Sequence, residues 1–252
     1  MRIKHLKVLS ILILFFYNLC NFHGKSPPVF QEKVIGRLLS EKIEEAVKKW
    51  TQYEHEEIKI NDQLKGDFDL KKREILRYLV KHENGKEFHY LLERDGRLNP
   101  KPQWILAKPR FAVDDKMFSD TRYDFNVEKE FYENGERFLV LSFKPIKNPP
   151  VSEGRDVVLN NMTGIVILRQ KDLLPIKIAA KLSREVEISG TGYQVKFFTM
   201  TIEVEFQEID KILMLKRVSA QYHFRFKVLF LFNVREENKK EEYIYSNFRR
   251  RQ

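Results

Sequence analysis

Histidine is the residue type of this chain best suited to metal binding and acid–base catalysis, and its spacing favours neither. The six histidines are His5, His23, His55, His82, His89 and His223. The last four lie singly in segments of alternating polarity, and no two of them have the spacing of a metal-binding motif. We therefore interpret them as surface or sheet-edge residues, and we predict no metal site and no cofactor.

Motifs for nucleophilic or phosphate chemistry are also missing from the sequence. It contains no Gly-x-Ser-x-Gly nucleophile elbow. The glycine-rich run Ser189–Gly192 lies between two predicted strands, whereas a phosphate loop needs the N-terminus of a helix, so a hairpin turn is predicted there. The neighbouring carboxylates Glu56 and Glu57 lie in a predicted strand, which points them to opposite sides. We predict a protein that is not an enzyme, and a hydrolase with two carboxylates remains the most distant alternative.

The start of the chain has the pattern of a secretory signal. Arg2, Lys4 and Lys7 precede the uncharged apolar run Val8–Tyr17. The run is shorter than the roughly 20 apolar residues that a membrane span needs. Residues 1–24 are therefore predicted to be a signal peptide or an N-terminal anchor, and residues 25–30 a linker. An exported protein of the periplasm, or of the periplasmic face of the outer membrane, is expected.

The single cysteine, Cys20, lies within this predicted signal. It is a candidate for lipidation, although Tyr17-Asn18-Leu19 stands where a lipobox has small residues. Cleavage, lipidation and an uncleaved anchor all stay open. With one cysteine at most, no disulfide framework can form, and an ordinary hydrophobic core must stabilise the chain.

The chain is basic, with a formal net charge of +10. A basic protein suits nucleic acid or anionic lipid, and export argues against nucleic acid. Charges of both signs alternate along most of the sequence, which is typical of solvated strand faces. The dense cluster Arg249–Arg251 lies in a predicted basic tail, residues 249–252, for which an anionic membrane surface is a candidate partner.

Hydrophobic periodicity predicts one helix followed by many strands. In residues 31–50 apolar side chains recur at three- and four-residue steps, which indicates an amphipathic helix. From residue 51 the period becomes two, and Asn84-Gly85 and Asn134-Gly135 indicate hairpins. Residues 97–122 contain three prolines and are predicted to form a long loop. The fold class predicted is mainly β (α+β): a curved antiparallel sheet or half-barrel of about nine to eleven strands packed on the N-terminal amphipathic helix, with residues 31–248 as a single domain.

The alternating strands of the last third carry an unusually aromatic apolar face, in a chain with 20 Phe and 10 Tyr. Either this face packs into a filled core or part of it lines a groove for acyl chains. Each buried methylene contributes roughly 0.8 kcal/mol, so such a groove binds without a polar site. The candidate ligand-binding residues are Leu38, Leu39, Phe198, Met200, Ile202, Val204, Phe206, Tyr222, Phe224, Phe226, Val228 and Phe230.

Short segments in order along the chain resemble the LolA/LolB-like family of lipoprotein-localisation factors, including uncharacterised outer-membrane-lipoprotein-sorting-like proteins. The segments are Tyr53–Glu57, Leu91–Arg97, Asn134–Pro145, Met162–Ile167 with Pro175–Lys177, and Tyr245–Phe248. The resemblance implies an incomplete barrel wrapped over helix, with an apolar cavity that binds lipid acyl chains or lipoproteins, and it implies no catalytic residues. The sequence departs from the family at Leu213–Leu215, where a proline is often found, and in residues 97–122.

Two hypotheses follow. In the first, the chain is a non-catalytic carrier or sensor of acyl chains in the cell envelope. In the second, it is an envelope scaffold or protein-binding module with a filled β core and no lipid ligand, whose partner surface lies around residues 97–122. A continuous apolar void between residues 31–50 and the sheet would favour the first hypothesis.

Overall fold

A computed structural model describes residues 31–107, 121–228 and 233–251 of the 252-residue chain. The predicted signal, its cysteine Cys20 and the linker at 25–30 lie outside these residues. The helices are α2 (Gln31–Trp50) and α3 (Gly154–Leu159). The strands are β1 (Tyr53–Leu64), β2 (Leu70–Glu83), β3 (Lys86–Arg94), β4 (Arg97–Leu98), β5 (Trp104–Leu106), β6 (Tyr123–Glu133), β7 (Glu136–Pro145), β8 (Met162–Arg169), β9 (Leu174–Leu182), β10 (Val186–Gly190), β11 (Tyr193–Ile209), β12 (Ile212–Val228) and β13 (Asn233–Arg250).

All thirteen strands join one antiparallel sheet, which confirms the predicted fold class. Its order is β4-β3-β2-β1-β13-β12-β11-β9-β8-β7-β6, with β10 paired to β11 and β5 to β3. The path ends at β4 and β6, so the sheet is not closed. The strands outnumber the prediction because the segment from residue 97 contains the short strands β4 and β5, which pair with β3.

Hairpin turns connect most neighbouring strands, and two of them are the turns predicted from Asn-Gly pairs. Asn84 and Gly85 have φ angles of 51° and 71°, and Asn134 and Gly135 have 50° and 78°. Two successive residues with positive φ match the right-handed twist of the strands, which is why Asn-Gly is favoured in such turns. The first long strand, β1, pairs along its whole length with residues 238–250 of the last strand, β13.

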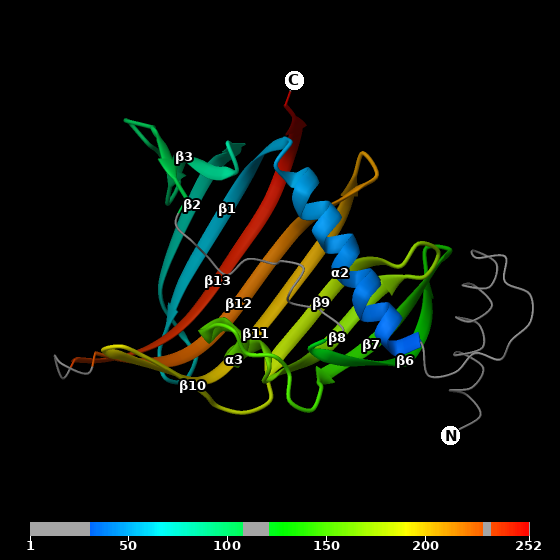
Figure 1. The fold of residues 1–252 in the computed structure, drawn as a ribbon. Helices are drawn as coiled ribbons and strands as arrows, with labels where there is room; N and C mark the ends of the chain where they lie inside the picture. The colour runs from blue at the N-terminus through cyan, green and yellow to red at the C-terminus, as the bar shows by residue number, and fades with distance from the viewer. Residues whose placement is uncertain (1–30, 108–120, 229–232, 252) are drawn as a thin grey trace, which may run out of the picture.

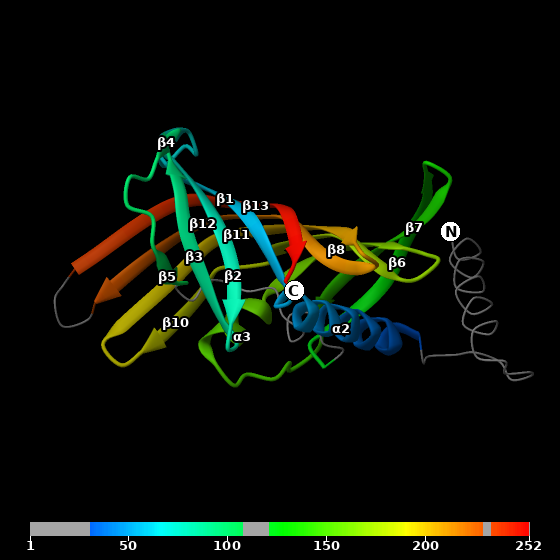
Figure 2. The same cartoon turned by 90° about the horizontal axis from the view of Figure 1, so that it is seen from above.

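The sheet is curved, and α2 and α3 lie on its inner side (Figures 1 and 2). Ile35, Leu39 and Ile43 of α2 are buried in one cluster with side chains from β6 to β12. The apolar stripe of α2 therefore packs on a filled core at this part of the sheet. No helix of the described ranges is long and apolar enough to span a membrane.

Strand β13 continues through Arg249 and Arg250, which pair with Glu54 and Tyr53 of β1. The backbone N–H of Arg251 then donates to the carbonyl of Gln52, at 2.9 Å. These arginines therefore extend the sheet and do not form a separate basic tail.

The end of α2 is held to the sheet by Trp50, whose Nε1 donates to the carbonyl oxygen of Leu213 at 2.5 Å. Trp50→Phe is expected to lower the free energy of unfolding by about 1–2 kcal/mol, because the carbonyl loses its partner. Urea unfolding followed by circular dichroism measures this. Trp104→Phe is the matched control, since Trp104 is 38% exposed, and it should change stability by less than about 0.5 kcal/mol. Equal effects of the two changes would show that the bond does not stabilise α2.

Candidate functional site

Five of the predicted ligand-binding residues lie in the filled core. Met200, Ile202, Val204 and Phe206 of β11 and Leu39 of α2 are at most 8% exposed. They belong to the buried cluster that joins α2 to the sheet. Leu38, next to Leu39 on α2, is only partly buried. This part of the predicted face therefore packs the fold together.

Phe198 does not share the face of Met200, and the prediction that it does is wrong. A β-bulge interrupts the pairing of β11 with β12, since Phe197 pairs with Phe224 and Thr199 pairs with His223. The extra residue reverses the alternation of side chains, as a bulge does. The ring of Phe198 lies 4.7 Å from the ring of His223 and 5.1 Å from the charged groups of both Lys196 and Arg225.

Phe197 takes the inner position instead, and it contributes to a group of rings on the inner face of β11 and β12. We call this group the aromatic patch: Tyr193, Phe197, Tyr222, Phe224 and Phe226. The ring centroids of Phe197 and Phe224 are 5.8 Å apart, those of Tyr222 and Phe224 5.7 Å, and those of Tyr193 and Phe226 6.3 Å. These are ordinary distances for interacting rings. Val228 pairs with Tyr193 at the end of the patch, and Phe230 lies outside the described residues.

The rings of the aromatic patch are less buried than the core beside them. Tyr193 is 41% exposed, and the other four members are partly buried. Phe197 and Tyr222 also contact the buried cluster. The patch is therefore a continuation of the core face that keeps part of its apolar surface accessible. The sequence pattern predicted Tyr222, Phe224 and Phe226 here, and it missed Tyr193 and Phe197.

A line of charged side chains borders the aromatic patch on β13. We call it the charged row: Arg235, Glu237, Lys239 and Glu241. Cross-strand pairing places Arg235 beside Phe226, Glu237 beside Phe224 and Lys239 beside Tyr222. Paired residues of an antiparallel sheet lie on the same face. Burial and the neighbouring carboxylate of Glu241 raise the pKa of the Tyr222 hydroxyl, which keeps it neutral.

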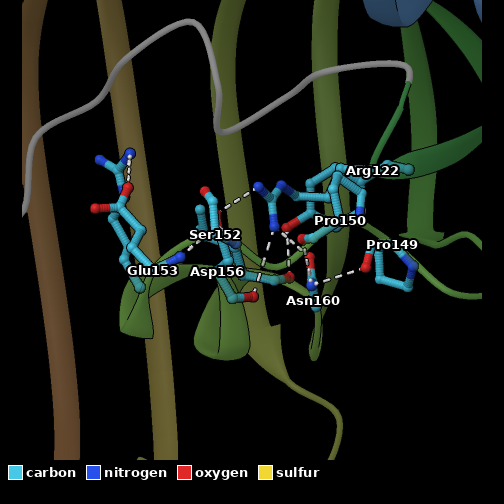
Figure 3. A network of polar contacts seen from close by, with 10 residues as sticks. Arg122, Pro149, Pro150, Ser152, Glu153, Asp156 and Asn160 are labelled. Carbon is cyan, nitrogen blue, oxygen red and sulfur yellow. Dashed lines mark hydrogen bonds and ion pairs between the residues drawn. The ribbon is translucent and has the colours of Figure 1, made fainter. Parts of the chain in front are cut away.

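A buried ion pair holds α3 and the segment before it against the sheet (Figure 3). Arg122 Nη2 and Asp156 Oδ1 are 2.6 Å apart, and their side chains are 6% and 4% exposed. Asp156 Oδ2 accepts from the hydroxyl and the backbone N–H of Ser152, each at 2.7 Å. Burial alone would raise the pKa of Asp156, but hydrogen bonds from Ser152, Glu153 and Arg122 outweigh it and hold that pKa well below its usual range. Arg122 also donates to the side chain of Asn160.

A separate cleft of about 410 Å³ lies where α2 ends beside the β2–β3 hairpin. It is lined by Thr51, His82, Glu83, Asn84, Gly85 and Arg251. Arg251 donates to the carbonyl oxygen of His82, and Glu83 accepts from Lys81. The lining is polar, so this cleft has the wrong chemistry for an acyl chain.

Among the described residues, no group of three or more His, Cys, Asp or Glu side chains is arranged to hold a metal ion. Within the same residues the histidines instead contact carboxylates or rings. Glu87 lies 2.7 Å from the Nε2 of His89 and 3.3 Å from that of His82. His55 stacks on Phe248 at a centroid distance of 5.2 Å.

Of the comparisons with known proteins, the comparison with solved structures finds similar chains. No family model matches the chain, and no curated protein matches it. A DUF1329 family protein from Desulfovibrio piger is 12% identical, with 87% of this chain and 93% of that chain covered and a TM-score of 0.39. A LolA superfamily protein from Nitrosomonas europaea is 12% identical, with coverages of 88% and 94% and a TM-score of 0.31.

A putative outer membrane lipoprotein-sorting protein domain from Vibrio parahaemolyticus is 14% identical. It covers 84% of this chain and 94% of its own, with a TM-score of 0.38. Two of these three solved structures, the LolA superfamily protein and the lipoprotein-sorting protein domain, have the family names to which the sequence segments were compared.

Proposed function

We propose that this chain is a non-catalytic carrier or sensor of the cell envelope that binds the acyl chains of lipids or lipoproteins on the aromatic patch. The observation that carries the proposal is that the core face of β11 and β12 continues beyond the filled core as partly accessible rings. Accessible apolar surface of this kind is typical of ligand grooves and interaction sites.

The energetics of the aromatic patch suit a ligand without polar groups along most of its length. An acyl chain gains roughly 0.8 kcal/mol for each methylene that leaves water. A chain of about 14 carbons therefore gains on the order of 10 kcal/mol before the entropic cost of binding is subtracted. Rings on adjacent strands, such as Phe197 and Phe224, offer a continuous surface for such a chain. No bond is made or broken, so the function needs no catalytic residue.

The scaffold hypothesis is the second candidate, and the packing of α2 favours it. Ile35, Leu39 and Ile43 lie in one buried cluster with Met200 and Ile202 of β11. An acyl chain is therefore not proposed to lie between this part of the helix and the sheet. The partner surface that the scaffold hypothesis predicts around residues 97–122 falls largely on residues 108–120, which lie outside the described residues. Within the described residues the two hypotheses differ at the aromatic patch, because a scaffold needs no accessible rings there.

The aromatic patch can be tested with N-phenyl-1-naphthylamine, a neutral apolar dye whose fluorescence rises on binding. The purified protein is expected to bind the dye, and tetradecanoic acid is expected to displace it. Replacing Phe224 and Phe226 together by serine should raise the Kd roughly tenfold or more, since about 1.4 kcal/mol of lost contact is a factor of ten. Neither side chain belongs to the buried cluster, so the fold should be retained.

Phe198→Ser provides the matched control for this test. It removes a ring from the same strand pair, but on the opposite face, beside Lys196 and Arg225. Its Kd for the dye should stay within about twofold of the unchanged protein, a difference below 0.5 kcal/mol. A protein that binds neither dye nor lipid, with no lipid retained in native mass spectrometry, would leave the scaffold hypothesis as the function.

A further inference from the structure

The border between the aromatic patch and the charged row places polar groups at one side of the proposed acyl site. Each ring of β12 has a charged neighbour on β13 on the same face: Tyr222 with Lys239, Phe224 with Glu237, and Phe226 with Arg235. On the other side of β12 the same three rings pair with apolar residues of β11: Phe226 with Val195, Phe224 with Phe197, and Tyr222 with Met200. A ligand lying across this border would meet apolar surface at one end and charge at the other.

The two cations of the charged row are more accessible than Glu237, the acid between them. The side chain of Arg235 is 69% exposed and that of Lys239 is 29% exposed, whereas Glu237 between them is 11% exposed. Glu237 forms ion pairs with both cations. Glu241, the other acid, accepts from the hydroxyl of Tyr243 at 3.1 Å. Both acids are therefore already engaged by groups of the protein.

Hydrogen-bond donors are in surplus at this border. A guanidinium carries five N–H donors and an ammonium three, while one carboxylate has two oxygens to share between them. Within the described residues, Glu237 is the carboxylate that both Arg235 and Lys239 contact. Arginine in particular pairs with carboxylate and phosphate through two parallel hydrogen bonds. The accessible side of the row is thus suited to an anion and not to a cation.

We propose that the ligand is an amphiphile with an anionic headgroup, which Arg235 and Lys239 bind while the acyl chain lies on the aromatic patch. This inference rests on the proposed function and adds the class of headgroup. A fatty-acid carboxylate and a lipid phosphate share the required chemistry, and both fit the same two cations.

The experiment compares four ligands with one saturated fourteen-carbon tail as competitors of the neutral dye N-phenyl-1-naphthylamine. They are tetradecanoate, tetradecyl phosphate, tetradecanol and tetradecyltrimethylammonium, each kept below the concentration at which it aggregates. The two anions should displace the dye at concentrations about tenfold lower than tetradecanol, which corresponds to one charge-assisted contact. The cation should be the weakest, and added salt should reduce the advantage of the anions. The stronger of the two anions identifies carboxylate or phosphate as the source.

Arg235→Gln should reduce the advantage of the anions over tetradecanol to threefold or less, with each displacement corrected for that variant's own Kd for the dye. Arg225→Gln is the matched control, because Arg225 pairs with Glu236 at 2.8 Å on the opposite face. It should keep the full advantage. Equal displacement by tetradecanol and the anions would overturn the headgroup inference and leave the proposed function intact. Failure of dye and of all four ligands to bind would instead overturn the proposed function.

Discussion

Replacing Asp156 by asparagine is expected to lower the free energy of unfolding by about 3–5 kcal/mol, as removal of one partner of a buried ion pair does. The change keeps the size of the side chain but leaves the Arg122 guanidinium buried without its counter-charge. Asp156 Oδ2 is also the acceptor for the hydroxyl and backbone N–H of Ser152. Urea unfolding at pH 7, followed by circular dichroism, measures the loss.

The pH dependence of stability gives an independent check on Asp156. Its folded-state pKa lies below the unfolded value of about 3.9. The ion pair therefore contributes its full stability above that unfolded value and loses it as pH falls towards the folded-state pKa. The difference in stability between the unchanged protein and Asp156→Asn should be constant from about pH 5 to pH 7 and should shrink below about pH 4.

Glu153→Gln is the control for this prediction. Glu153 lies three residues before Asp156 and pairs with Arg155 at 3.1 Å, but its side chain is 52% exposed. Exposed pairs contribute about 0–1 kcal/mol, so the variant should lose less than 1 kcal/mol. An Asp156→Asn protein as stable as the Glu153→Gln protein would show that the pair does not anchor α3.

The helix and the hairpin turns could be predicted from the sequence, because each depends on residues that are close together in the chain. The helix at 31–50 follows from one apolar stripe, and its bounds coincide with α2. The Asn-Gly hairpins follow from the need for positive φ at two successive residues. The pairing of β1 with β13 joins residues almost 200 positions apart, and no local pattern encodes such a contact.

The candidate site was predicted only in part, because a single inserted residue changes which side chains share a face. Strict alternation assigned Phe198 to the inner face, and the bulge gives that position to Phe197. A bulge needs no glycine or proline, and none is found at Phe197 to Thr199. The role of Asp156 was missed for another reason, since Glu153 and Asp156 form a capping box. The usual signature of that motif has Ser or Thr at the N-cap and Glu or Gln three residues later, and Glu153-Gly-Arg-Asp156 does not match it.

The inner face of the sheet has two parts that bear on the two functional hypotheses in different ways. Under α2 the inner face is packed, as a scaffold requires, with Ile43 and Val204 fully buried. Beyond the bulge the same face remains partly accessible and borders charged side chains. A carrier needs both the packed part and the accessible part, because a stable core must support an apolar surface that is not itself needed for folding.

Replacing Gly164 by alanine is the second change with a large expected effect, because it forces a methyl group against the neighbouring strands β7 and β9. Gly164 of β8 lies between Phe143 of β7 and Ala180 of β9. A Cβ there would be 2.0 Å from the carbonyl oxygen of Ala179 and 2.8 Å from the ring of Phe143. The first of these atoms is backbone, so β8 and β9 would have to separate.

Overpacking a well-filled core lowers the free energy of unfolding by about 1–3 kcal/mol. A clash with backbone atoms is expected to lower it by at least the upper value, because backbone cannot move aside as a side chain can. Gly164→Ala should therefore lose about 3 kcal/mol or more in urea unfolding and should expose hydrophobic surface to dye. Gly66→Ala is the matched control, because a Cβ at Gly66 would meet nothing within 4 Å. That change should be neutral or stabilise by up to about 1 kcal/mol, through the reduced freedom of the unfolded chain. If the two variants are equally stable, a Cβ at Gly164 does not clash with the carbonyl oxygen of Ala179, and β8 and β9 lie farther apart there than described.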